Sequence, residues 1–175
     1  MQTAILAGGC FWCLEAVYAQ LQGVIHVKSG YIAGEMANPS YQAVCTGQTG
    51  HAEAVQIDFD EHTISYPQLL QVFFAIHDPT TLNRQGNDVG TQYRSGIYTL
   101  NPEQLQDAQT ALAHAQNDQA QPIVTEIQAA TTFYPAETEH DAYFFENPYQ
   151  GYCQWVIAPK VQHARQQFAP LWRQQ

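Results

Sequence analysis

The sequence predicts an α+β fold, a two-layer arrangement in which helices pack on one face of a sheet. Short runs of alternating apolar residues, typical of strands, are interspersed with segments whose apolar residues recur at helical spacing. The strands are few and the irregular stretches between them are long, which argues against a doubly wound nucleotide fold. We expect a ferredoxin-like α/β plait core with long irregular excursions. It should form a single domain over residues 1–175, with a mobile C-terminal segment from about residue 146.

The chain opens on a strand, a tight turn and a helix. The apolar run 4–7 predicts a buried strand, and the two glycines at 8–9 permit a sharp turn. Apolar residues at helical spacing then predict a helix over 11–21, which ends near Gly23. Cys10 therefore lies where the strand ends and the helix begins.

Two further strands and a capped helix follow. Alternating apolar residues predict strands over 24–31 and 53–59, and the stretch 32–50 between them is rich in turn residues. Such a long irregular stretch inside a compact domain is usually functional or mobile. Ser65, in the position of an N-cap, introduces a strongly apolar helix over 69–76.

The second half of the chain has a similar mixture of elements. A second irregular stretch, rich in Asn, Gly and Asp, covers 80–91. Asn101 is followed by a proline, which is typical of a helix start. The remaining elements are expected to be a strand over 92–100, a helix to about 117, a strand over 123–127, a short helix over 136–145, a polar loop over 146–154 and a weakly amphipathic segment over 161–172.

Charge and composition exclude several classes of protein. Six basic against sixteen acidic residues give a net charge of −10, so there is too little Lys and Arg for a nucleic-acid surface. No apolar run reaches membrane-spanning length and no leader pattern is present, so we expect no membrane association and a cytoplasmic, monomeric protein. The four cysteines are irregularly spaced, which favours redox or nucleophilic use over a secreted disulfide framework.

Cys10 is the strongest candidate for a nucleophile. Free amide groups and the positive end of the helix dipole at a helix start predict a lowered pKa for its thiol. Phe11 and Trp12 follow it directly and would place apolar walls beside the sulfur. The alternative is a buried structural cysteine on a core helix.

A carboxyl group and two hydroxyl groups could complete such a site. Glu53 lies where a loop meets an apolar strand, and burial there would raise its pKa and let it donate a proton near neutral pH. The alternative is an exposed glutamate at a strand edge. Tyr41 and Tyr93 suit binding or proton donation, or else belong to the core. Asp88 is either a turn residue or a group that orients substrate.

A metal site is not expected. Structural zinc usually needs two close-spaced ligand pairs, and Cys10 with Cys13 supplies only one. His51 has no second histidine at ligand spacing beside it. We therefore expect neither a metal nor another cofactor.

Ordered motifs occur along almost the whole chain, from about residue 4 to 155. They are Gly9-Cys10-Phe11-Trp12 with Glu15, Gly30-Tyr31, Asn38-Pro39-Ser40-Tyr41 with Cys45, the run 49–55, His77-Asp78-Pro79-Thr80, the run 83–95, the run 133–137 with His140, and Gly151-Tyr152-Cys153. Together they resemble the A-type peptide methionine sulfoxide reductases, a family that repairs one methionine sulfoxide epimer. The first motif and the run 83–95 are the most specific.

The resemblance implies the reduction of methionine (S)-sulfoxide, free or in proteins, to methionine. Cys10 would be the nucleophile that attacks the sulfoxide sulfur, and Glu53 the acid that protonates its oxygen. The hydroxyls of Tyr41 and Tyr93 would help, and Asp88 would support the site. This pairing is chemically sensible, because a sulfoxide sulfur is attacked only when its oxygen is protonated or strongly hydrogen-bonded.

The resemblance also implies how substrate is held and how the enzyme is recycled. Phe11 and Trp12 would form the apolar pocket for the S-methyl group. The sulfenic acid left on Cys10 would be converted to an intramolecular disulfide, with Cys153 as the resolving thiol. A thioredoxin-like dithiol would then reduce that disulfide.

Alternatives and departures remain open. Cys13 stands where the family commonly has glycine, and it is the alternative resolving thiol because it is only three residues from Cys10. Cys10 and Cys13 could also form the redox pair of a CxxC thiol–disulfide oxidoreductase. A third possible function is a peptide-binding module whose aromatic groove binds methionine-like side chains. Cys45 is expected to be a buried bystander. Ala33 replaces a usual glycine, Asp141 replaces a usual glutamine, and no cysteine follows Cys153.

Overall fold

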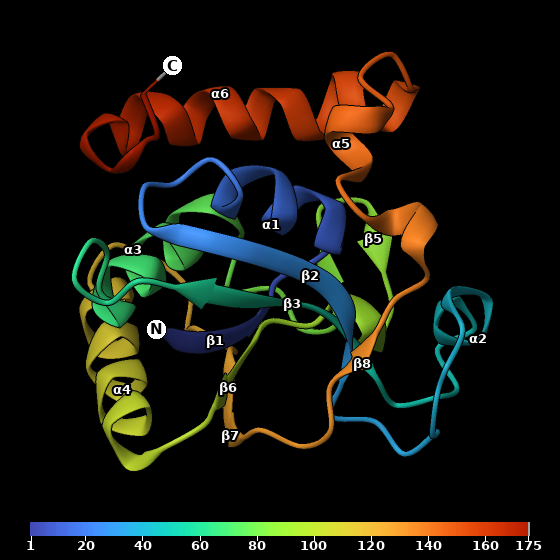
Figure 1. Cartoon of the computed structure of the whole chain (residues 1–175). Coiled ribbons are helices and arrows are strands. Elements are labelled where there is room, and N and C mark those ends of the chain that lie inside the picture. The colour runs from blue at the N-terminus through green and yellow to red at the C-terminus, as the bar shows by residue number, and fades with distance from the viewer. Residues whose placement is uncertain (175) are drawn as a thin grey trace.

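The computed structural model describes residues 1–174, and a six-stranded sheet forms its centre (Figure 1). The strands of the sheet are β1 (Gln2–Ala7), β2 (Val24–Ile32), β3 (Ala52–Phe59), β6 (Gly96–Thr99), β7 (Glu126–Ala129) and β8 (Tyr134–Pro135). They lie in the order β7-β6-β1-β3-β2-β8, and only the pair β6 and β7 is parallel. β4 (Arg84–Gln85) and β5 (Asp88–Val89) form a separate ribbon. The predicted α+β class is confirmed.

Helices connect and cover these strands. They are α1 (Phe11–Tyr18), α2 (Tyr41–Cys45), α3 (Tyr66–Ile76), α4 (Pro102–Gln116), α5 (Tyr143–Glu146) and α6 (Ala158–Gln167), with 3₁₀ turns η1 (Thr91–Tyr93), η2 (Thr138–His140) and η4 (Ala169–Leu171) and a π-helical turn η3 (Cys153–Ile157). The predicted caps are present. The Ser65 hydroxyl accepts from the Gln68 amide at 3.2 Å and the Gln68 side chain accepts from the Ser65 amide at 2.9 Å, which closes a capping box. The Asn101 side chain accepts from the Gln104 amide at 2.8 Å.

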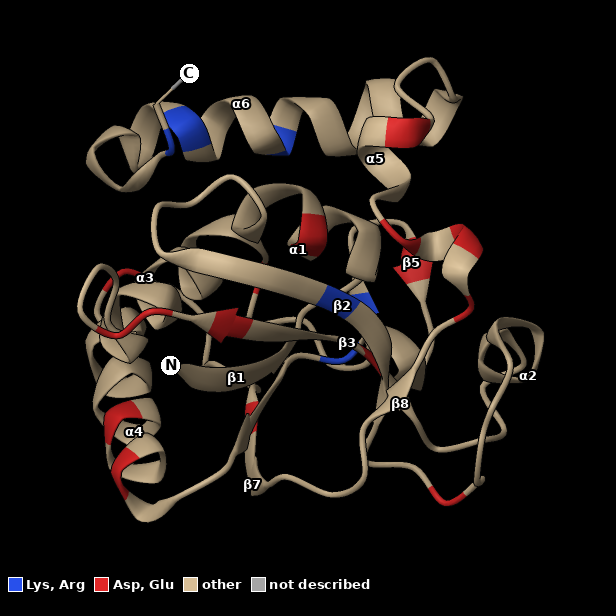
Figure 2. Cartoon of the chain, viewed as in Figure 1, with Lys and Arg blue, Asp and Glu red and all other residues tan. Residues whose placement is uncertain are grey.

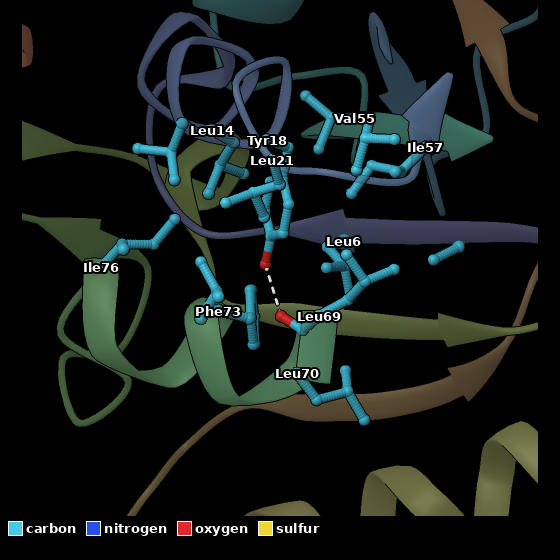
Figure 3. Packing of buried hydrophobic residues seen from close by; sticks show 14 of the residues in the cluster. Leu6, Leu14, Tyr18, Leu21, Val55, Ile57, Leu69, Leu70, Phe73 and Ile76 are labelled. Atoms are coloured by element: carbon cyan, nitrogen blue, oxygen red, sulfur yellow. Dashed lines mark hydrogen bonds between the residues drawn. The ribbon is translucent and has the colours of Figure 1, made fainter. Parts of the chain in front are cut away.

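The main core lies between one face of the sheet and the helices α1, α3 and α4 (Figure 3). Leu6 of β1 and Val55 and Ile57 of β3 point into it. The hydroxyl of Tyr18 in α1 donates to the carbonyl of Leu69 in α3 at 2.8 Å, so its polar end is satisfied inside the core. α6 runs along the outer side of α1, away from the sheet (Figure 1).

The pleat of β3 determines where its first side chains point. Alternate residues of a strand share a face, so Glu53 lies on the same face as Val55 and Ile57, under the helices. Ala52 and Ala54 pack instead in a smaller cluster on the opposite face, against Ile32 and Tyr98 among others. The strand register therefore places Glu53 beneath the start of α1.

The strand expected over 123–127 lies further along the chain. β7 begins only at Glu126, which pairs with Gly96 of β6. The residues before it are used elsewhere, since the amide of Val124 donates to the carbonyl of Pro79 at 2.8 Å. The alternation of apolar residues therefore predicted the strand correctly but placed its start too early in the chain.

The helix expected over 136–145 is wrong. Ala142 has a left-handed φ of 51°, which interrupts any helix there and separates η2 from α5. The strand expected over 92–100 is also shorter, because Tyr93 belongs to η1 and β6 starts at Gly96. The stretch 32–50 contains the short helix α2.

Charge and hydropathy follow the sequence. Acidic residues are spread over many elements, and the few Lys and Arg residues are scattered as well (Figure 2). Within residues 1–174, none of the helices combines the length and the apolar character needed to cross a bilayer.

Candidate active site

The turn before α1 requires glycine at position 9 and leaves little room for a side chain at position 8. Gly9 has a φ of +90°, and a Cβ at this position would lie 2.6 Å from Cγ of Gln85. A Cβ on Gly8 would lie 3.1 Å from the ring of His77. The absence of side chains lets the chain turn between these neighbours and delivers Cys10 to the N-cap position of α1.

Cys10 is a buried thiol, with 7% of its surface exposed. Burial raises its pKa well above the ordinary value, and the hydrogen bond with Cys13 and the charge of Glu53 raise it further. The amide of Trp12 at the helix start acts in the opposite direction, as the sequence predicted, but desolvation outweighs it. The prediction of a lowered pKa for this thiol is therefore wrong, because Cys10 is buried.

Glu53 is enclosed beside that thiol, with only 1% of its surface exposed. Burial is the main cause that raises its pKa to about 8, and the charge of Asp88 adds to the effect. Its Oε1 accepts from the amide of Phe11 at 3.2 Å, which opposes the rise, while Oε2 is buried without a hydrogen-bond partner among residues 1–174. The exposed-edge alternative is excluded, and the carboxyl is neutral at pH 7 with one oxygen free to act.

Tyr41, Tyr93 and Asp88 come from three different segments, and each lies near enough to Glu53 for their charges to interact. Burial is the largest cause that raises the pKa of both tyrosines, and the charge of Glu53 comes next. Cys10 also contributes to the raised pKa of each. The tyrosine hydroxyls thus stay protonated, and the structure brings together all five polar groups that the sequence singled out.

Aromatic rings form one wall of the site. Phe11 and Trp12 each stack with Tyr41 at a centroid distance of 6.1 Å. The ring of Tyr143 lies almost parallel to that of Trp12, at 3.8 Å and 8°. The indole N–H of Trp12 donates to Nδ1 of His140 at 3.1 Å. These contacts fix the Trp12 ring in one orientation.

The other cysteines divide into two groups. Cys13 and Cys153 are buried in one cluster with Cys10, and all three are free thiols. Cys45, in contrast, is exposed, so the expectation that it is buried is wrong. α2 is too short to bury more than one residue, and Val44 takes that place.

Sequence reasoning assigned no role to three contributors. His140 and Tyr143 hold Trp12, and the hydroxyl of Tyr152 donates to Oδ2 of Asp88 at 2.7 Å. All three lie more than sixty residues from their partners. The sequence feature that could have indicated these residues is the aromatic content around the Gly-Tyr-Cys motif. No local pattern could link that feature to Trp12 or Asp88.

His51 has a structural part. It is 1% exposed, its Nδ1 accepts from the amide of Gly34 at 3.0 Å, and its Nε2 lies 2.7 Å from the carbonyl of Met36. These contacts pin the irregular stretch against β3. Among the described residues, Glu137, Glu139 and His140 could approach an ion together, but Glu137 already accepts from the amide of Tyr41 at 3.1 Å.

Comparison with known proteins agrees with this geometry. A family model described as peptide methionine sulfoxide reductase matches residues 2–171. The peptide methionine sulfoxide reductase MsrA of Pasteurella multocida (strain Pm70) is 55% identical over 172 residues, which are 98% of this chain and 99% of the relative. The enzyme of the same name from Acinetobacter baumannii (strain SDF) is 54% identical over the full length of both chains.

Solved structures give the same result. The reduced form of Mxr1 from Saccharomyces cerevisiae is 37% identical and superposes with a TM-score of 0.82, over 86% of this chain and 87% of that one. Methionine sulfoxide reductase A of Corynebacterium diphtheriae is 36% identical with a TM-score of 0.81, over 84% of this chain and 75% of that one. By sequence over its full length and by fold, the chain belongs to the peptide methionine sulfoxide reductase family.

Proposed function

We propose that this chain reduces methionine (S)-sulfoxide, free or in proteins, to methionine through Cys10. The observation that carries the proposal is the state of Glu53. Its carboxyl is neutral at pH 7, Oε1 is held by the amide of Phe11, and Oε2 is buried without a partner beside the thiol. A protonated oxygen on Oε2 is the donor that a sulfoxide oxygen needs, since its protonation makes the sulfur electrophilic.

The chemical step then balances with these groups alone. The Cys10 sulfur attacks the sulfoxide sulfur and forms an S–S bond while Glu53 delivers its proton to the oxygen. The S–O bond of the substrate and the new S–S bond then break as the hydroxyl moves to the Cys10 sulfur and methionine leaves. The products are methionine and a sulfenic acid on Cys10, and the thiol proton of Cys10 restores the acid. The hydroxyls of Tyr41 and Tyr93 assist at the oxygen, and Asp88 supports the site through Tyr152.

Phe11 and Trp12 are proposed to receive the S-methyl group. Trp12 offers a fixed apolar surface, because Tyr143 stacks on it and His140 holds its N–H. A methyl group buried against such rings gains a favourable transfer free energy of about 0.8 kcal/mol. A fixed wall also discriminates between the two sulfoxide epimers, since only one presents oxygen to Glu53 and methyl to Trp12.

Recycling requires a second thiol and an external dithiol. Cys153 is the proposed resolving thiol, with Cys13 as the alternative, because both are buried in the same cluster as Cys10. A structure of Mxr1 in complex with Trx2, 26% identical with a TM-score of 0.59, supports a thioredoxin as the reductant here. We also propose that the protein is cytoplasmic and monomeric and that it uses neither a metal nor another cofactor.

Two features of the architecture are also proposed. The order β6-β1-β3-β2 with antiparallel pairs, connected through α1 and α3, supports a ferredoxin-like plait as the core of one domain. The segment from about residue 146 carries Cys153 and is proposed to move during recycling, so that the disulfide reaches the reductant.

The test is turnover of the separate sulfoxide epimers with dithiothreitol, followed by chromatography of methionine. Methionine should form from the S epimer and not from the R epimer. No methionine from either epimer would reject the proposal. Because Cys10 and Cys13 are free thiols buried in one cluster, a CxxC disulfide reductase is the second candidate. That candidate predicts reduction of a protein disulfide without any turnover of sulfoxide.

A further inference from the structure

Arg94 directly follows the turn that carries Tyr93, and the mechanism above gives it no task. It is the C-cap of η1 and belongs to the specific run 83–95. Its side chain is only 15% exposed although it carries a full positive charge. A largely buried charge needs partners for its donors, so those partners indicate what Arg94 holds.

The guanidinium group of Arg94 makes three hydrogen bonds, each from a different nitrogen. Nε donates to Oε1 of Glu126 at 3.0 Å. Nη1 donates to the carbonyl of Thr91 at 2.9 Å, and Nη2 donates to the carbonyl of Gly50 at 3.0 Å. The planar fork of donors holds these acceptors in a fixed mutual geometry. One side chain therefore connects β7, η1 and the loop before β3, and we call Arg94 with its three acceptors the arginine clamp.

Glu126 anchors the arginine clamp to the sheet. Its Oε2 accepts from the hydroxyl of Tyr98 in β6 at 3.0 Å, so both of its carboxylate oxygens are occupied. The amide of Glu126 donates to the carbonyl of Ser95 at 3.0 Å, and Tyr98 is fully buried. The guanidinium group is therefore fixed to the part of the sheet where β6 and β7 pair.

Two proton donors of the proposed site lie just beyond the ends of the arginine clamp. Thr91 and Tyr93 belong to the same three-residue turn, whereas Gly50 lies three residues before Glu53. After burial, the charge of Glu53 is the next cause that raises the pKa of Tyr93, which indicates that the hydroxyl and the carboxyl lie near each other. The clamp therefore links the turn that carries the hydroxyl to the segment that carries the carboxyl.

Glu53 has supports of its own, whereas Tyr93 depends more on the arginine clamp. Glu53 is held by the pairing of β3 with β2, and its Oε1 accepts from the amide of Phe11. Tyr93 belongs to a turn outside the sheet. The side chain of Gln92 ties that turn to the carbonyl of Cys45, but at a long 3.5 Å. Loss of the clamp should therefore displace Tyr93 and leave Glu53 in place.

We infer that Arg94 is a positioning residue, which holds the Tyr93 hydroxyl where it can donate to the sulfoxide oxygen. The inference rests on the proposed function and deepens it, because it explains how one of the proposed donors is placed. A group misplaced by about 1 Å can cost about 10²-fold in rate. Breaking the arginine clamp should therefore slow the chemical step through Tyr93.

The test measures methionine release from the S-sulfoxide in a single turnover of Arg94→Gln. An amide has neither the charge nor the fork of donors, so release at saturating sulfoxide should be about tenfold slower. The sulfoxide concentration that gives half of the maximal rate should change by less than about twofold. The reason is that Phe11 and Trp12, which are proposed to receive the methyl group, belong to α1 and not to the clamp.

Arg173→Gln is the matched control, because it also removes a guanidinium group from two backbone carbonyls. Nη2 of Arg173 donates to the carbonyl of Leu21 at 3.2 Å and to that of Val24 at 2.6 Å, between α1 and β2. This variant should lose stability in urea but keep the wild-type rate of methionine release. A slower rate in this control, equal to that of Arg94→Gln, would overturn the inference.

Arg94→Lys tests whether the positive charge alone is sufficient. Lysine keeps a charge beside Glu126, but a single ammonium group lacks the planar fork that reaches the carboxylate and both carbonyls. Methionine release should therefore remain slow in this variant. A wild-type rate in Arg94→Lys would overturn the inference.

A double-mutant cycle identifies the group through which Arg94 acts. In Tyr93→Phe, which already lacks the hydroxyl, Arg94→Gln should slow release by less than about twofold further. In Tyr41→Phe, the full effect of about tenfold should remain. A merely structural role would give the same loss in both backgrounds, and that result would overturn the inference.

The outcomes also separate this inference from the proposed function. Equal single-turnover rates in Arg94→Gln and the wild type would overturn the role of Arg94 while the sulfoxide is still reduced. Absence of any methionine from the folded wild-type protein would reject the proposed function instead. If Arg94→Gln does not fold, Glu126→Gln carries the same cycle, because it removes the charge that anchors the arginine clamp and leaves Arg94 present.

Discussion

The amide of Phe11, in the first turn of α1, donates a hydrogen bond of 3.2 Å to Oε1 of Glu53, near the start of the strand β3 beneath the helix. This one contact orients the carboxyl. Because Oε1 is occupied by a donor, the proton of the neutral acid belongs on Oε2, which has no hydrogen-bond partner among residues 1–174. The acid and the helix that carries the nucleophile are therefore positioned by the same bond.

Glu53→Gln tests the acid. An amide keeps the shape and can still accept from Phe11, but it cannot deliver a proton, so sulfenic acid formation should slow by about 10²–10⁴-fold. Single-turnover methionine release measures the step directly, and binding of substrate should change much less. Glu15→Gln is the matched control, since Glu15 is also buried, with a pKa raised to about 7 by burial, but accepts from the amide of Tyr143 at 3.3 Å. An unchanged rate in Glu53→Gln would mean that the carboxyl is structural.

The pH dependence of this site follows from the raised pKa of Glu53. The protonated form is the active one, so the single-turnover rate should fall as pH rises through about 8. For stability, the folded state holds the proton more tightly than the unfolded chain, whose carboxyl has a pKa of 4.5. The contribution is therefore fully present below 4.5 and is lost as pH rises through about 8.

The free energy of unfolding should accordingly decline over that range in the wild type and decline less in Glu53→Gln. Denaturant titrations at several pH values measure it. The lowered pKa values of Asp78 and Glu137 act in the opposite direction and at lower pH, so the comparison with the variant isolates Glu53. Parallel pH profiles of the two proteins would contradict the raised pKa.

Cys10→Ser should abolish sulfoxide reduction and leave the fold intact. The hydroxyl has nearly the size of the thiol but is not ionised near neutral pH, so it cannot attack the sulfoxide sulfur. Methionine release should fall below detection, while the thermal midpoint stays within a few degrees of the wild type, roughly what 1 kcal/mol would shift. Appreciable turnover in this variant would move the chemistry to another thiol.

Gly9→Ala should destabilise the protein by about 2–3 kcal/mol. The new Cβ would need a left-handed backbone and would lie 2.6 Å from Cγ of Gln85, which packs under the turn. Gly151→Ala is the matched control, because a Cβ there meets nothing within 4 Å and its φ is not positive. Equal unfolding midpoints in urea for the two variants would show that the turn relaxes without cost.

Ala33→Gly should stabilise the protein by about 0.5–1 kcal/mol. Ala33 has a φ of 69°, a left-handed conformation that costs an alanine about 1–2 kcal/mol and a glycine almost nothing. The larger conformational freedom of glycine in the unfolded chain offsets part of the gain. Urea denaturation measures the difference, and a less stable variant would mean that the Ala33 methyl group contributes more packing than its backbone costs.

Local patterns predicted local structure well. Ser65 and Asn101 were recognisable as caps because a short side chain before an apolar helix has one dominant use. The turn at residues 8–9 followed from glycine content, whereas the local sequence left open whether Glu53 is buried or exposed. These features depend only on neighbours within a few residues.

The features that were predicted wrongly depend instead on contacts between residues far apart in the chain. The position of β7 depends on pairing with β6, and the break at Ala142 depends on contacts made after it, including that of Tyr143 with Trp12. The helix start does act to lower the pKa of Cys10, but the sequence could not show how deeply η3 would bury that thiol. Long-range packing therefore determined the part of the site that local reasoning missed.

The cover over the nucleophile has a consequence for synthesis. Cys10 is made before the residues that close its cluster, which lie between Tyr143 and Val161. At ~5–20 residues per second, a ribosome reaches Cys153 roughly 7–30 s after Cys10. During that interval the growing chain carries two thiols of α1 without their cover. The newborn chain thus depends on a reducing environment until its own C-terminal third folds back and seals the sulfur away.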